Sequence, residues 1–122
     1  MTENIPPILR PDHVAGVSLQ KLAEKFDLEV LASHSSRLLT GISMNTSDLR
    51  PGDLFVAMPG KKTHGANFVE RAIELGAVAV ITDSAGLGLL SQENQLQSDC
   101  PVLVLENPRS RLGELAAFVY GN

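Results

Sequence analysis

The sequence is poor in cysteine and in aromatic residues. Of its 122 residues, one is a cysteine, one is a tyrosine, four are phenylalanines and none is a tryptophan. A single cysteine excludes a disulfide bond within the chain and a metal site built from several cysteines. Few aromatic rings disfavour a single-stranded nucleic-acid binder, which stacks bases on such rings. The formal net charge of −4 also disfavours a general nucleic-acid-binding protein, because such proteins are normally basic.

Long apolar runs are absent as well. No run approaches the roughly 20 residues needed to span a bilayer. The N-terminal segment, residues 1–11, is polar and proline-rich, and it lacks the cationic start and apolar core of a signal peptide. We therefore expect a cytoplasmic chain with neither a membrane nor a nucleic acid as its partner.

Several motifs of nucleotide-binding and hydrolytic enzymes are also missing. The sequence contains no G-x-x-x-x-G-K-[ST], no G-x-S-x-G and no H-E-x-x-H, which excludes a P-loop, a nucleophile elbow and a common zinc site. The pair Gly86 and Gly88 lacks the third glycine of a dinucleotide-binding fingerprint. The three histidines lie far apart without ligand-like spacing, so no metal site is predicted.

The second half of the sequence alternates short apolar runs with amphipathic segments. This alternation predicts an α/β fold, a small and mostly parallel sheet flanked by helices. The expected strands are Thr40–Met44, Leu54–Met58, Ala77–Ile81 and Val102–Leu105, and the expected helices cover about 66–75, with Phe68 facing inward, and the chain from Pro108 onward, capped by Asn107.

The N-terminal and the glycine-rich segments fit this scheme less simply. We expect residues 1–17 to form an extended arm and residues 18–122 to form one domain. Ser18 is a good cap for a helix over Leu19–Phe26. The segment Ser84–Pro101 is rich in glycine, serine and glutamine, and it predicts a loop with at most one weak helix around Leu89–Asn94.

Two polar loops follow neighbouring expected strands. The first is Met44-Asn45-Thr46-Ser47-Asp48, whose hydroxyl, amide and backbone groups suit a polar ligand. The alternative is that these side chains only satisfy the backbone of their own turn.

The second loop runs from Gly60 to Gly65 and carries Lys61, Lys62, Thr63 and His64. It connects a buried strand to the start of a helix, which is a usual position for binding an anion in an α/β sheet. The alternative is a solvated surface loop. Arg109 is expected to face solvent, or else to face a ligand nearby.

Three stretches of the sequence resemble a known protein family. Residues 40–65 read TGISMNTSDLRPGDLFVAMPGKKTHG, residues 66–83 read ANFVERAIELGAVAVITD, and residues 101–121 read PVLVLENPRSRLGELAAFVYG. About residues 14–121 resemble the N-terminal, UDP-binding domain of the Mur ligases, and most of all the UDP-N-acetylmuramoyl-tripeptide synthetases (MurE type) of actinobacteria.

The resemblance implies a function in peptidoglycan synthesis. Such ligases use ATP and Mg²⁺ to join meso-diaminopimelate or L-lysine to UDP-N-acetylmuramoyl-L-alanyl-D-glutamate. The P-loop lies on their central domain, so the resemblance implies no catalytic residue and no bound ATP or Mg²⁺ in this chain. Its implied partners are the UDP-muramoyl dipeptide and the central and C-terminal domains of the same enzyme.

The resemblance also places the substrate contacts on the two loops. The uridine-contacting positions fall on Met44 and Thr46, with Asn45 and Ser47 as neighbours, and on Lys61, Lys62 and Thr63. Many family members have D-S-R where this sequence has Asn45, Thr46 and Ser47. The arginine is therefore missing, and Lys61 or Lys62 is expected to face the diphosphate instead.

Two alternatives stay open at this point. One is the N-terminal domain of the ligase that adds D-alanyl-D-alanine (MurF type), which shares the P-G-x-L-F-V-A pattern. The other is a non-catalytic α/β module for protein association, which would show an exposed apolar patch and no affinity for uridine nucleotides.

Overall fold

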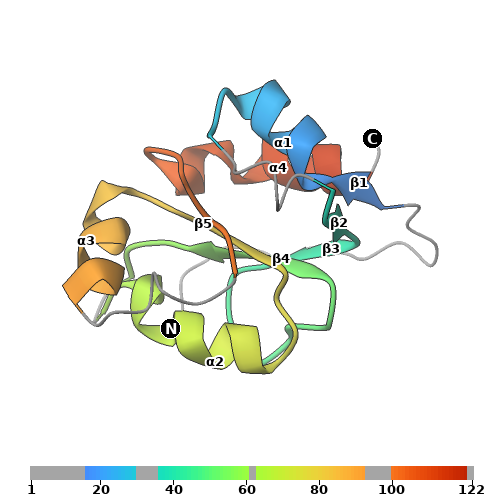
Figure 1. Ribbon diagram of the computed structural model, residues 1–122. Helices are drawn as coiled ribbons and strands as arrows, with labels where there is room; N and C mark the ends of the chain where they lie inside the picture. The colour runs from blue at the N-terminus through green and yellow to red at the C-terminus, as the bar shows by residue number, and fades with distance from the viewer. Residues whose placement is uncertain (1–15, 30–35, 61–62, 93–99, 121–122) are drawn as a thin grey trace.

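The chain folds around a four-stranded parallel sheet. The computed structural model describes residues 16–29, 36–60, 63–92 and 100–120. The strands lie in the order β3-β4-β5-β6, and helices cover both faces of the sheet (Figure 1). Their bounds are Gly41–Ser43 for β3, Asp53–Ala57 for β4, Ala79–Thr82 for β5 and Val102–Val104 for β6. The prediction of an α/β fold with a mostly parallel sheet is confirmed.

The two faces of the sheet have separate hydrophobic cores. Helices α1 (Leu19–Phe26) and α4 (Leu112–Tyr120) pack on one face, together with Leu54 and Val56 of β4. Helix α2 (Val69–Glu74) packs on the other face, together with Phe55 and Ala57. Successive side chains of a strand point to opposite faces, so β4 is buried on both sides as predicted.

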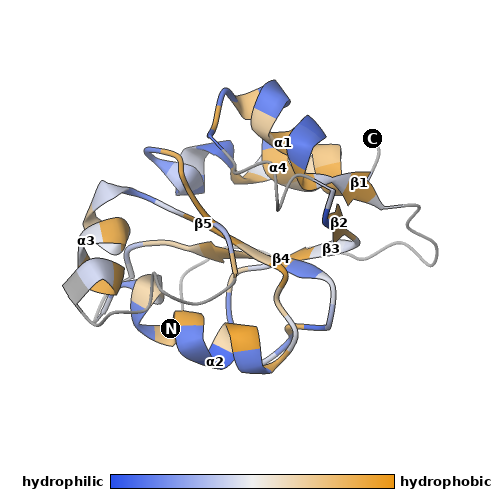
Figure 2. Cartoon of the chain, viewed as in Figure 1, coloured by the Kyte–Doolittle hydropathy of each residue, from blue (hydrophilic) through white to orange (hydrophobic). Residues whose placement is uncertain are grey.

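Helix α1 forms where its sequence predicts it. The Ser18 hydroxyl accepts a hydrogen bond of 3.2 Å from the backbone N–H of Lys21, which satisfies one of the free amides of the first turn. The buried side chains recur at three- and four-residue spacing and are Leu19, Leu22, Ala23 and Phe26. Figure 2 shows the opposite, hydrophilic side of this helix facing away from the sheet.

A small second sheet precedes the main one. Strand β1 (Val17–Ser18) pairs antiparallel with β2 (Leu38–Leu39), with Val17 opposite Leu39. Val17 is the last residue of the arm predicted over residues 1–17, and residues 1–15 of that arm lie outside the described part of the chain. The pairing was not predicted, because two-residue strands show no measurable alternation.

The segment after the lysine loop begins with a tighter helix than predicted. Residues Gly65–Phe68 form the 3-10 helix η2, and α2 follows directly. A 3-10 helix repeats every three residues, so Ala66 and Val69 turn inward. Phe68 is 47% exposed, and the prediction that it faces the core is wrong.

The prediction for the glycine-rich segment is also wrong over its first half. Residues Ser84–Gln92 form helix α3, whereas the sequence predicts a loop there with at most a weak helix that starts near Leu89. The backbone N–H of Gly86 donates to the Asp83 carboxylate at 2.8 Å, and Leu90 is buried in the core beneath α2. A helix cap and tertiary packing thus outweigh the low helix propensity of two glycines. Residues 93–99 lie outside the described part.

Helix α4 is preceded by a 3-10 turn and is tied to α1. The 3-10 helix η4 covers Pro108–Arg111 with Asn107 at its N-cap position, as predicted, but the Asn107 side chain makes no cap hydrogen bond. The Arg111 guanidinium lies 5.0 Å from the ring centroid of Phe26 and bonds to Glu114 at 2.6 Å. That hydrogen bond lowers the pKa of Glu114.

No helix in the described ranges is long and apolar enough to cross a membrane.

Candidate functional site

The two candidate loops leave the sheet at the same edge. Strands β3 and β4 are parallel neighbours, with Ser43 opposite Phe55. The loop that starts at Met44 therefore follows β3 at the edge where the loop that starts at Met58 follows β4. The carboxyl ends of parallel strands are the usual place for ligands in α/β sheets.

The loop after β3 is held by its own side chains. The Ser43 hydroxyl lies 2.6 Å from Asp48 Oδ1 and 2.7 Å from the Asn45 carbonyl oxygen. The Ser47 hydroxyl donates to the Asn45 side-chain oxygen at 2.6 Å. The turn-stabilising interpretation thus applies to Asn45 and Ser47.

Thr46 differs from these two neighbours. Among the described residues, its hydroxyl has no hydrogen-bond partner, and its side chain is partly exposed. Met44, also partly exposed, packs against the core on the α1 side of the sheet. The loop therefore presents one hydroxyl and one thioether side chain on a rigid turn.

The loop after β4 is closed by backbone pairing. Pro59 and His64 form an antiparallel bridge, the Gly60 N–H donates to the Thr63 carbonyl at 3.0 Å, and the Gly65 N–H donates to the Met58 carbonyl at 2.7 Å. The Thr63 hydroxyl accepts a hydrogen bond from the Asn67 amide. Lys61 and Lys62 lie outside the described residues.

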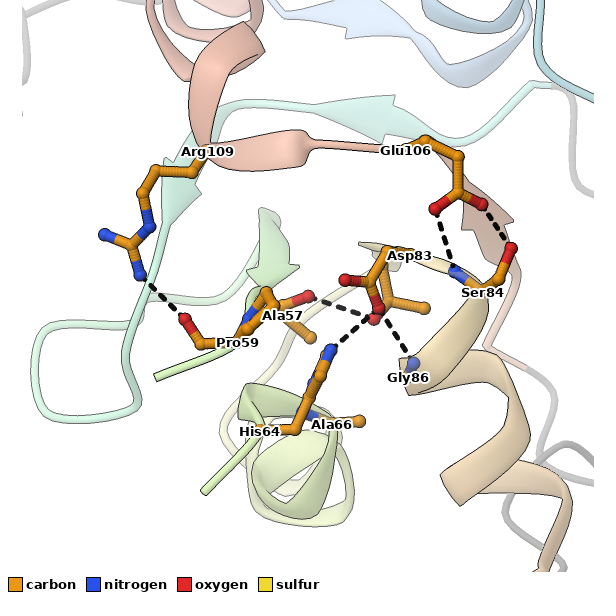
Figure 3. Close-up of polar contacts among 10 residues, drawn as sticks. Ala57, Pro59, His64, Ala66, Asp83, Ser84, Gly86, Glu106 and Arg109 are labelled. Atoms are coloured by element: carbon orange, nitrogen blue, oxygen red, sulfur yellow. Dashed lines mark hydrogen bonds and ion pairs between the residues drawn. The ribbon is translucent and has the colours of Figure 1, made fainter. Parts of the chain in front are cut away.

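Arg109 reaches this second loop from the last helical segment. Its Nη2 donates to the Pro59 carbonyl at 2.8 Å, across 50 positions of sequence, while the side chain stays exposed (Figure 3). The expected solvent exposure of Arg109 is therefore observed, and its guanidinium also contacts the backbone of the loop. A contact between Arg109 and a ligand stays a prediction.

His64 and Asp83 form an interaction that sequence reasoning missed. His64 Nε2 lies 2.8 Å from Asp83 Oδ1, and the two side chains are only 9% and 13% exposed (Figure 3). His64 Nδ1 accepts the backbone N–H of Ala66 at 2.9 Å. The sequence contains only a weak signal for this pair. It consists of a histidine directly before a helix and an aspartate directly after an apolar run that forms a strand.

A second acidic contact lies further along the same edge. The Ser84 hydroxyl and backbone N–H both bond to the carboxylate of Glu106, which follows β6. No group of three or more metal-ligating side chains occurs in the portion of the chain that the structure describes.

Comparison with known proteins places the chain in a family. Residues 38–120 match the model described as "Mur ligase family, catalytic domain". The UDP-N-acetylmuramoyl-L-alanyl-D-glutamate–2,6-diaminopimelate ligase of Streptomyces coelicolor is 43% identical over all 122 residues, which are 22% of that protein. The UDP-N-acetylmuramyl-tripeptide synthetase of Leifsonia xyli is 37% identical over 98% of the chain and 22% of its own length.

Solved structures agree with the fold. A UDP-N-acetylmuramoyl-L-alanyl-D-glutamate–2,6-diaminopimelate ligase matches 84% of this chain and 18% of its own, with 25% identity and a TM-score of 0.58. MurF from Acinetobacter baumannii matches 86% of this chain and 21% of its own, with 19% identity and a TM-score of 0.60. The chain spans about a fifth of the length of its relatives. With a family model matched over 38–120 and 43% identity along the whole chain, the protein belongs to the Mur ligase family.

Proposed function

We propose that this chain is the N-terminal, substrate-binding domain of a ligase that acts on UDP-N-acetylmuramoyl-L-alanyl-D-glutamate in peptidoglycan synthesis. The observation that carries the proposal is the 43% identity to a diaminopimelate-adding ligase along the entire chain. The amino acid added is meso-diaminopimelate or L-lysine, and the enzyme acts in the cytoplasm. Residues 18–122 form the domain, and residues 1–17 precede it as an arm.

The chemistry of amide formation lies outside this chain. The sequence has no P-loop, so ATP and Mg²⁺ belong to the central domain of the full-length enzyme. The acyl-phosphate that the amine attacks forms there as well. This chain is the part that holds the UDP end of the substrate, and its partners are that substrate and the other two domains.

The geometry of the two loops supports this role. Thr46 supplies a hydroxyl that its own turn does not use, and Met44 supplies an apolar surface beside it. Asn45 and Ser47 hold the turn in shape. Lys61, Lys62 and Thr63 belong to the loop after the neighbouring strand, where two cations suit the diphosphate.

Replacing Thr46 with valine tests the hydroxyl. We expect UDP affinity to fall about two- to tenfold, because one neutral hydrogen bond contributes about 0.5–1.5 kcal/mol. Calorimetric titration of the 122-residue chain with millimolar UDP is the measurement, and binding is expected to be weak because other domains complete the site. Thr46→Ser is the matched control and should bind as the wild type does. Equal affinities of all three would refute the role of Thr46.

Replacing Lys61 and Lys62 together with alanine tests the charge. We expect UDP to bind about three- to tenfold more weakly, since exposed ion pairs contribute about 0.2–1 kcal/mol each. Uridine, which has no phosphate, should lose less than about twofold. An equal loss for both ligands would show that the lysines do not face the diphosphate.

The alternative functions give different results. A chain that binds no UDP at millimolar concentration fits the protein-association module. A full-length enzyme that joins D-alanyl-D-alanine, and neither diaminopimelate nor lysine, to its UDP-linked substrate fits the MurF type. The assay is amide formation with each amino-acid donor supplied separately.

A further inference from the structure

The His64 ring is held from three directions. Its Nδ1 accepts from the Ala66 N–H at 2.9 Å, and its Nε2 bonds to Asp83 Oδ1 at 2.8 Å. On the third side, a Cβ atom added to Gly86 would come within 2.7 Å of His64 Cε1. The ring therefore fills the space beside the first turn of α3.

These contacts fix the tautomer of the ring. Nδ1 accepts a hydrogen bond and so carries no proton, which leaves the proton on Nε2. Nε2–H then donates to the Asp83 carboxylate. The neutral ring thus accepts from the Ala66 N–H and donates to the Asp83 carboxylate at the same time. A ring with both nitrogens protonated could not accept from the Ala66 N–H.

Asp83 connects this histidine to the sheet and to α3. The same oxygen, Oδ1, accepts from His64 and from the Gly86 N–H at 2.8 Å. Asp83 follows β5 directly, and β5 is the neighbour of β4 in the sheet. The carboxylate is therefore a fixed anchor at the site edge.

The loop between Pro59 and His64 is clamped at both ends. Arg109 bonds to the Pro59 carbonyl at one end, and Asp83 holds His64 at the other. Pro59 and His64 also face each other in a backbone bridge. The position of His64 thus sets where Thr63, its neighbour in the loop, lies.

We propose that His64, held by Asp83, is a positioning residue that keeps Thr63, at the end of the loop after β4, in its UDP-binding arrangement. The proposal rests on the proposed function for its ligand. A loop that is already ordered before the ligand arrives binds it more tightly, because binding then carries no entropic cost for ordering the loop. No contact between His64 and UDP is implied.

Four variants separate this role from simple stabilisation. In His64→Asn, the shorter amide still accepts from the Ala66 N–H as a helix cap but does not reach Asp83. Asp83→Ala removes the same bond from the other side, together with the bond to the Gly86 N–H. Asp83→Asn retains an oxygen that accepts from both His64 and Gly86, and it is the matched control. His64→Ala removes both the cap and the anchor.

UDP titration of the 122-residue chain is the first measurement. We expect about five- to twentyfold weaker binding for His64→Asn and Asp83→Ala, and binding within about twofold of wild type for Asp83→Asn. Circular dichroism and urea unfolding identify variants that remain folded. Folded His64→Asn and Asp83→Ala that bind UDP like the wild type would overturn the proposal and leave His64 a structural cap.

Amide hydrogen exchange gives a readout that needs no ligand. The Gly60 N–H, bonded to the Thr63 carbonyl at 3.0 Å, should exchange about tenfold faster in His64→Asn and Asp83→Ala but not in Asp83→Asn. Unchanged exchange in all variants would overturn the clamp. If wild type binds no UDP, the proposed function fails, while the exchange rates still decide whether His64 orders the loop.

Discussion

Replacing Phe55 with alanine is expected to lower the free energy of unfolding by about 3–5 kcal/mol. Phe55 is 1% exposed and is among the largest fully buried side chains of the described residues. It lies in the middle of β4 and packs toward α2. Strands border β4 on both sides, so the structure has little freedom to close the cavity. Urea unfolding followed by circular dichroism measures the change.

Phe68→Ala is the matched control, since it removes the same ring from the surface. Phe68 is 47% exposed, and we expect a loss below about 1 kcal/mol. Equal losses for the two variants would contradict the assignment of Phe55 to the core. A larger loss of stability for Phe68→Ala than for Phe55→Ala would support the inward orientation of Phe68 that helical spacing predicts.

Replacing Gly86 with alanine is expected to destabilise the protein by about 1–3 kcal/mol. An added Cβ would overlap the Thr82 hydroxyl and approach His64 Cε1. Thr82 is fully buried and donates to the Ala57 carbonyl at 2.9 Å, so it cannot rotate away without breaking that bond. The variant should also weaken UDP binding, because the new methyl group displaces the His64 ring.

Replacing Gly88 with alanine, in the same helix, is expected to have the opposite effect on stability. Nothing lies within 4 Å of a Cβ at Gly88, so alanine is expected to stabilise α3 by up to about 1 kcal/mol. Thermal unfolding of both variants under one set of conditions measures the contrast. Two stabilised variants would show that α3 does not pack against Thr82 and His64.

Local sequence patterns correctly predict the elements in which buried residues recur at a regular spacing. The cap at Ser18 and the spacing of Leu19, Leu22 and Phe26 predict α1 correctly. The apolar run of β4, bounded by turn-forming residues, predicts a strand buried on both faces. The order of strands and loops also predicts correctly that the Thr46 and Thr63 loops share one edge.

Local patterns failed where a distant contact decides the structure. Helix α3 forms despite Gly86 and Gly88 because Asp83 caps it and Leu90 enters the core. Phe68 faces outward because the 3-10 helix before α2 changes the phase of the side chains. The Asp83 cap spans only three residues and is a local signal, whereas the burial of Leu90 depends on the core that the assembled sheet and α2 provide.

The amino-acid order alone therefore determined the α/β class, the main strands and the two polar loops, because each depends on the burial of neighbouring residues with a regular period. Tertiary structure alone decided that Asp83 anchors His64, 19 positions away, and that Arg109 holds Pro59, 50 positions away. Such bonds depend on which side chains the finished sheet brings to one edge. Hydrogen-bond geometry of a few ångströms is fixed only once both cores have packed.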